Sequence, residues 1–106
     1  IKAGDLLVVI SGSGGTKTLL PILETAKSKG AKIAVISMKS SSPMADMSDL
    51  NVQIGNDDAF PLTKGMPMGT TFELSTLVFL EATIGEIIFD KDLTEDGMRA
   101  VHANLE

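Results

Sequence analysis

The sequence predicts a layered α/β domain: a three-layer arrangement of one parallel sheet with helices on both faces. Short apolar runs have the composition of strands, and segments with helical spacing separate them. The first two strands are joined by a short connection that contains a helix, which implies parallel pairing with a right-handed crossover. The predicted strands are 6–10, 32–37 and 50–54, and the predicted helices are 18–29, 44–47, 70–89 and one that starts near 94.

The first strand leads into a loop of small residues and then a helix. Residues 6–10 form an unbroken aliphatic run, which is typical of a strand buried on both faces. The run ends at Ser11-Gly12-Ser13-Gly14-Gly15-Thr16. In the helix that follows, Pro21 fits only in the first turn and Gly30 is a typical stop.

The later elements have clear capping signals. Ser42 followed by Pro43 is typical of the start of a short helix. Residues 50–54 alternate apolar and polar side chains, as a half-exposed strand does. Thr94 can cap the last helix, which is expected to carry His102 near its end.

Composition narrows the function classes. A chain of 106 residues, 43% of them hydrophobic, suits one domain with one core. A net charge of −5 without a Lys/Arg cluster argues against nucleic acid or an anionic membrane as a partner. With no Cys and one His, the sequence excludes disulfides and argues against a zinc site, so we expect a cytoplasmic protein.

The loop after the first strand is the candidate binding site. Ligands of parallel sheets bind beyond the carboxyl ends of the strands, where loops lead into helices. Small residues let a ligand approach the backbone, hydroxyls donate hydrogen bonds, and the helix start carries a partial positive charge. This combination favours a phosphate group. The predicted ligands are Ser11, Gly12, Ser13 and Thr16, with Ser42 from the neighbouring loop.

Two nucleotide motifs fail on spacing. The dinucleotide fingerprint begins correctly at Gly12 and Gly14 but has Lys17 where the third Gly belongs. The nucleotide P-loop needs Gly directly before Lys, and here Thr16 separates them. A tight turn without a ligand remains an open alternative.

Glu73 and His102 are the candidate catalytic residues. Glu73 heads a helical stripe of apolar residues that we expect to be buried, so partial desolvation would prepare its carboxylate to accept a proton. An exposed first-turn Glu that complements the helix dipole explains the residue equally well. His102 is a natural proton donor, although a lone His near a C-terminus is more often a surface residue. The stripe comprises Glu73, Leu77, Leu80, Ile84 and Ile87.

Three motifs resemble a known family. Residues 10–14, Ile-Ser-Gly-Ser-Gly, after a strand led by Gly-Asp resemble the sugar isomerase (SIS) domain, which has a flavodoxin-like fold. Residues 66–73 and 102–106 resemble 6-phospho-3-hexuloisomerases more specifically. The resemblance covers the whole chain. It departs from the family pattern at Gly15, where a charged residue such as Glu is common, and at Glu81, where Asp is more usual.

The resemblance implies a function. It is the interconversion of 3-hexulose 6-phosphate and fructose 6-phosphate through an enediol, a step of the ribulose monophosphate pathway, without metal or nucleotide cofactor. The loop with Ser11, Ser13 and Thr16 would hold the phosphate, and Glu73 would be the base. His102 would assist proton transfer, across a subunit interface of a homodimer or homotetramer.

The resemblance also implies that part of the domain is absent from this sequence, and it leaves two alternative functions open. Residues 1–106 would form a single SIS domain that lacks its N-terminal helices and first strand. Another phosphosugar isomerase, of the arabinose 5-phosphate type, remains an alternative. So does a non-catalytic SIS domain that binds a phosphosugar and regulates a partner.

Overall fold

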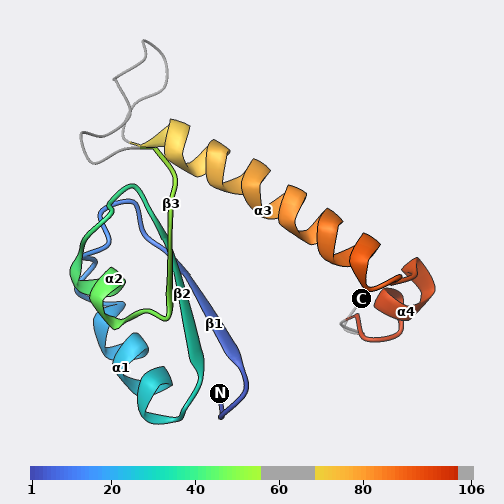
Figure 1. The fold of residues 1–106 in the computed structure, drawn as a ribbon, viewed down its shortest axis with the longest axis horizontal. Coiled ribbons are helices and arrows are strands. Elements are labelled where there is room, and N and C mark those ends of the chain that lie inside the picture. The colour runs from blue at the N-terminus through green and yellow to red at the C-terminus, as the bar shows by residue number, and fades with distance from the viewer. Residues whose placement is uncertain (56–68, 103–106) are drawn as a thin grey trace. The chain divides into compact units, whose positions relative to one another are not determined.

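The computed structural model describes residues 1–55 and 69–102, and the chain divides into two compact units, Ile1–Thr76 and Leu77–Glu106. Every predicted helix and strand is present, and apart from the C-terminal end of the last helix their ends lie within two residues of those expected (Figure 1). The elements are β1 (Leu6–Ile10), α1 (Leu20–Ser28), β2 (Lys32–Ser37), α2 (Pro43–Met47), β3 (Leu50–Gln53), α3 (Thr70–Asp90) and α4 (Glu95–Arg99).

The three strands form one parallel sheet in the order β1-β2-β3. Val9 of β1 pairs with Val35 of β2, and Val35 pairs with Asn51 of β3. Since parallel neighbours require crossover connections, α1 and α2 link the strands and pack against β2. The predicted parallel α/β class is confirmed.

The core of the first unit lies between the sheet and these two helices. Strand β2 is central, and its residues 33–37 are all buried. Apolar burial is the main favourable term in folding, so this layer holds the unit together. The core residues are Val9, Leu23, Ala26, Ala31, Ile33, Val35 and Met44.

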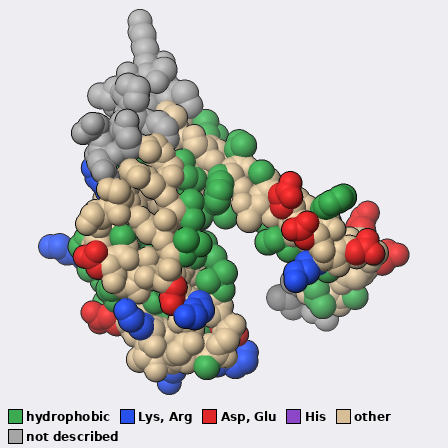
Figure 2. Space-filling model, viewed as in Figure 1, with side chains coloured by type: hydrophobic (Ala, Val, Ile, Leu, Met, Phe, Trp, Pro, Cys, Tyr) green, Lys and Arg blue, Asp and Glu red, His purple; other side chains and the backbone are tan. Residues whose placement is uncertain are grey.

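Strand β1 is buried on one face. Val9 is 7% exposed, whereas Leu6, Val8 and Ile10 are 62%, 44% and 47% exposed. Successive side chains of a strand point to opposite faces, so the three exposed residues share one face. The prediction that residues 6–10 are buried on both faces is wrong for the described chain. Figure 2 shows hydrophobic side chains at the surface beside the strands.

Helix α1 begins two residues later than predicted. A turn precedes Leu20, and Pro21 lies in the first turn, where its missing N–H costs no helical hydrogen bond. Gly30 ends the helix at φ +77°, and the Ala31 N–H donates to the Ala26 carbonyl at 3.1 Å. The predicted stop at Gly30 is confirmed.

Helix α2 and strand β3 are fixed by short polar contacts. The Ser42 hydroxyl accepts a hydrogen bond from the Ala45 N–H at 3.1 Å, which confirms the predicted cap. After α2, the Asp49 carboxylate accepts from the Lys32 ammonium at 2.8 Å and from the Ile33 N–H at 2.9 Å. The hydrogen bond from Lys32, followed by that from Ile33, lowers the pKa of Asp49.

Helix α3 starts at Thr70, as predicted, and buries Phe72 and Thr76. Leu77, Ile84 and Ile87 are each about half exposed, at 56%, 50% and 49%. The prediction of a buried stripe is therefore wrong for the described residues. Within the parts of the chain that the structure describes, no helix is both long and apolar enough to cross a membrane.

Helix α4 is a short element of the second unit. The Thr94 hydroxyl accepts from the Gly97 N–H at 3.1 Å, which confirms the predicted cap. The helix ends at Arg99, and His102 lies in the turn that follows. The prediction that this helix carries His102 is wrong, because the last helical hydrogen bonds stop short of that residue.

The two neighbours Leu23 and Ile22 provide a matched test of the core. Leu23 is completely buried, whereas Ile22 is 50% exposed. We expect Leu23→Ala to lower the free energy of unfolding by about 2–5 kcal/mol. Ile22→Ala should lower the free energy of unfolding by a clearly smaller amount. Urea unfolding of both variants measures the difference, and equal losses would contradict the assigned core.

Asp49 makes stability depend on pH. Its folded-state pKa lies below the ordinary 3.8, so ionised Asp49 stabilises the fold above that value, and the contribution is lost as pH falls through the folded-state pKa. Asp49→Asn should therefore destabilise the protein at about pH 7, with the difference from the original protein shrinking below about pH 4. Thermal melts across this range measure it. A difference that stays constant with pH would refute the assignment.

Candidate active site

Ser11 shapes the loop that follows β1. Its N–H donates to the Ile36 carbonyl at 3.0 Å, which continues the strand pairing by one residue. Its side chain is buried, accepts from the Gly14 N–H at 3.2 Å, and lies 2.9 Å from the Thr16 hydroxyl. Ser11 thus joins the two ends of the loop.

Gly14 lies against the neighbouring loop. Its φ is +63°, and a Cβ added there would come 2.3 Å from the Ser42 hydroxyl oxygen. The Met44 N–H donates to the Gly14 carbonyl, and the Met38 N–H donates to the Gly12 carbonyl, both at 3.1 Å. Loop 11–16 and loop 38–42 are therefore held together at the carboxyl edge of the sheet, with Ser42 beside Gly14.

The loop offers donors to a ligand. Ser13 and Thr16 are exposed, and the Ser13 hydroxyl accepts from the Gly15 N–H at 3.2 Å, which leaves its proton available. The N–H groups of Gly12, Ser13 and Thr16 have no acceptor among the described residues. Unpaired hydroxyl and amide donors in one short loop are suited to binding an anion.

Helix α1 contributes less to this site than the sequence predicts. It starts at Leu20, after a turn, and Pro21 in its first turn has no N–H to donate. The field of a helix end falls off within about one turn. Side-chain hydroxyls and loop amides are thus the principal donors.

The first turn of α3 lies against the same loop. Phe72 is 5% exposed, and its ring carbons lie 3.4 and 3.6 Å from the position of a Cβ built on Gly12. The Met38 methyl carbon lies 3.2 Å from that position. Glu73 follows Phe72 directly, is exposed, and donates its N–H to the Gly69 carbonyl at 3.0 Å. The contact of Phe72 thus brings the turn that carries Glu73 to the loop.

Thr76 was missed by sequence reasoning. It is 3% exposed, and its hydroxyl has no hydrogen-bond partner. Buried polar groups are nearly always paired, so this unpaired hydroxyl, one helical turn after Phe72, is notable. Neither Thr76 nor Phe72 stands out in the sequence, because both are common helical residues and only their burial distinguishes them.

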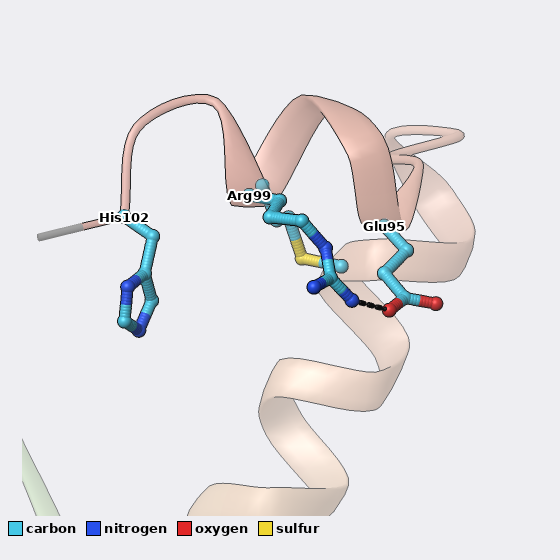
Figure 3. A pocket seen from close by; sticks show the side chains of 4 residues that line it. Glu95, Arg99 and His102 are labelled. Atoms are coloured by element: carbon cyan, nitrogen blue, oxygen red, sulfur yellow. Dashed lines mark hydrogen bonds and ion pairs between the residues drawn. The ribbon is translucent and has the colours of Figure 1, made fainter. Parts of the chain in front are cut away.

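His102 belongs to the second unit. It lines a pocket with Glu95, Met98 and Arg99, and Figure 3 shows the labelled side chains projecting from the same side of the chain. Arg99 pairs with Glu95, and the His102 N–H donates to the Arg99 carbonyl at 3.2 Å. The other predicted site residues all lie in the first unit. Residues 1–55 and 69–102 contain no group of three side chains suited to hold a metal ion.

A family profile of the SIS domain matches residues 1–82. The chain belongs to the SIS-domain family. This confirms the membership that the loop motif predicts. It also agrees with the parallel sheet and with the position of the hydroxyl-rich loop at the carboxyl edge of that sheet.

Relatives of this SIS chain include named isomerases. It is 65% identical over 108 residues to the 3-hexulose-6-phosphate isomerase of Methylomonas aminofaciens, covering 100% of this chain and 60% of that protein. It is 34% identical to the protein of the same name from Bacillus subtilis, again over 100% of this chain and 60% of the relative. The chain spans about 60% of the length of these curated relatives.

Solved structures support the fold. A crystal structure of a protein from Methanococcus jannaschii, for which a function of 3-hexulose-6-phosphate isomerase was inferred, matches with a TM-score of 0.81 and 33% identity. The match covers 100% of this chain and 57% of that one. A second crystal structure, of a hypothetical protein, matches with a TM-score of 0.83 and 37% identity, over 99% of this chain and 58% of that one.

Gly14 and Gly15 provide a paired test of the loop in this SIS domain. Gly14→Ala would meet Ser42 and would place a side chain at positive φ, a strain that alone costs about 1–2 kcal/mol. At Gly15 the nearest atom to an added Cβ is the Ser13 carbonyl oxygen at 4.0 Å. We expect Gly14→Ala to lower the free energy of unfolding by at least that strain, and Gly15→Ala to change it by less than about 0.5 kcal/mol. Denaturant titration distinguishes the two variants. If neither changes the free energy of unfolding, the close approach of Gly14 to Ser42 is disproved.

Proposed function

We propose that this protein is a sugar-phosphate isomerase that interconverts 3-hexulose 6-phosphate and fructose 6-phosphate. The structural observation that carries the proposal is the packing of Phe72 over Gly12, because it brings the turn with Glu73 to the hydroxyl-rich loop. The 65% identity to the Methylomonas aminofaciens isomerase, over the whole of this chain, supports the substrate.

The phosphate end of the substrate would bind in loop 11–16. Exposed Ser13 and Thr16 can donate their hydroxyl protons, and the loop amides can add further hydrogen bonds. Ser11 holds the loop closed through Gly14 and Thr16. Ser42 already accepts from the Ala45 N–H, so its proton is the part that can reach an anion.

The reaction needs a base near the middle carbons of the sugar. Starting from the 3-hexulose, the Glu73 carboxylate would remove the proton from C2, and the C3 carbonyl oxygen would take up a proton, which produces a 2,3-enediol. The acid form of Glu73 would return a proton to C3 while the C2 hydroxyl loses its own, which leaves a carbonyl at C2. His102 would serve as the proton donor and acceptor for these oxygens.

Orientation by the phosphate supports this chemistry. A positioned base contributes about a hundredfold to ten-thousandfold in rate. Fixing the phosphate holds C2 and C3 in one place and thereby lowers the entropic part of the barrier. Proton transfer between carbon and oxygen in this scheme requires neither a metal nor a nucleotide, so we propose a cofactor-independent enzyme.

The working form would be a homodimer or homotetramer in the cytoplasm, acting in the ribulose monophosphate pathway. Helix α3 exposes large apolar side chains: Leu77, Val78 and Phe89 are 56%, 69% and 83% exposed. Association with another copy would remove such surface from water. In this assembly, His102 would be supplied by a second copy.

Replacement of Glu73 tests the proposed base. Glu73→Gln keeps the shape of the side chain but cannot accept a proton, so kcat for fructose 6-phosphate should fall about 10²- to 10⁴-fold. Glu81→Gln, on the same helix and also exposed, is the matched control and should keep its activity. Full activity of Glu73→Gln would exclude this residue as the base. Turnover of arabinose 5-phosphate alone would reject the proposed substrate.

A further inference from the structure

We propose that Lys17 binds the phosphate group of the sugar phosphate and supplies the positive charge of the phosphate loop. The proposal rests on the proposed function for the identity of the substrate. Lys17 follows Thr16 directly, and neither the dinucleotide fingerprint nor the P-loop motif explains its presence.

Most of the other described lysines of the first unit lie at the opposite edge of the sheet. Lys2 precedes β1 and pairs with Asp5 at 3.1 Å, and Lys32 starts β2 and pairs with Asp49 at 2.8 Å. Lys27 lies in the last turn of α1 and donates to the Met47 carbonyl at 3.4 Å. Since α1 runs back along the parallel strands, its end lies at their amino edge, away from loop 11–16.

Lys17 is placed differently. It lies in the turn between loop 11–16 and α1, at the carboxyl edge of the sheet, and it is exposed. It forms no ion pair or side-chain hydrogen bond with another described residue. Lys39 also follows the carboxyl end of a strand, but it is half-buried and engaged in other contacts. Among the residues that the structure describes, Lys17 is thus the cation at this edge whose ammonium remains available to a ligand.

The chemistry of the loop needs such a charge. A phosphate monoester carries about −1.5 to −2 charges near neutral pH. The hydroxyl and amide donors of residues 11–16 are neutral, and the chain as a whole carries a net charge of −5. An exposed ammonium beside these donors would offset the repulsion and strengthen phosphate binding as a mobile point charge.

The expected effect is on binding and not on the chemical step. The phosphate does not react, so Lys17 would hold it equally well in the ground state and the transition state. Loss of such uniform binding raises KM and leaves kcat unchanged. A merely structural role would not produce this separation, because a distorted loop would also misplace the sugar and lower kcat.

The test compares three variants of the full chain. Lys17→Met removes the charge, Lys17→Arg keeps it, and Lys29→Met removes a charge that is also exposed but lies at the opposite edge. We expect Lys17→Met to raise KM for fructose 6-phosphate and the inhibition constant of inorganic phosphate together, by about five- to fiftyfold, with kcat within about twofold. Lys17→Arg should restore most of the affinity, and Lys29→Met should match the original protein. Circular dichroism checks the fold of each variant.

Calorimetric titration with fructose 6-phosphate and with inorganic phosphate gives a readout that does not require turnover. If the original protein binds both but does not convert fructose 6-phosphate, the proposed function fails, and the affinity difference between Lys17→Met and Lys29→Met still decides the role of Lys17. Equal affinities in these two variants, a fall in kcat with unchanged KM, or no phosphate binding by the original protein would each overturn the proposal.

Discussion

The close contact between the Gly14 backbone and Ser42 is the constraint on which the rest of the candidate site depends. Ser42 caps α2, and its hydroxyl oxygen lies only 2.3 Å from the position that a Cβ of residue 14 would take. The Met44 N–H to Gly14 carbonyl hydrogen bond fixes the same pair of segments. Because β1 and β2 are adjacent and parallel, their following loops emerge side by side, and a glycine is what lets them meet without strain.

The hydroxyl residues of the SIS loop divide into two groups by burial. Ser11 and Ser42 are buried. The Ser11 hydroxyl accepts a hydrogen bond from the backbone of the loop, and the Ser42 hydroxyl accepts one from the backbone of α2. Ser13 and Thr16 are exposed at the rim, where a ligand can reach them. A site of this kind separates the groups that preserve its shape from those that bind, so the binding geometry exists before the ligand arrives.

Burial is where prediction from sequence failed. The aliphatic run of β1 and the stripe of α3 both have the composition of buried segments, yet Val8 and Ile84 are 44% and 50% exposed. Apolar periodicity specifies which side chains share a face, but not what covers that face. The prediction for His102 failed for a related reason. Helix α4 ends at Arg99, and the sequence encodes the end of a short helix only weakly.

The sequence by itself determined the order of the elements, the glycine stop at Gly30 and the caps at Ser42 and Thr94, because each depends on hydrogen bonds and backbone angles within a few residues. Only the tertiary structure decided that Phe72 covers Gly12 and that the Thr76 hydroxyl is buried without a partner. Residues 12 and 72 are far apart in the chain. Their contact follows from the packing of the first turn of α3 against loop 11–16, and no local pattern encodes such packing.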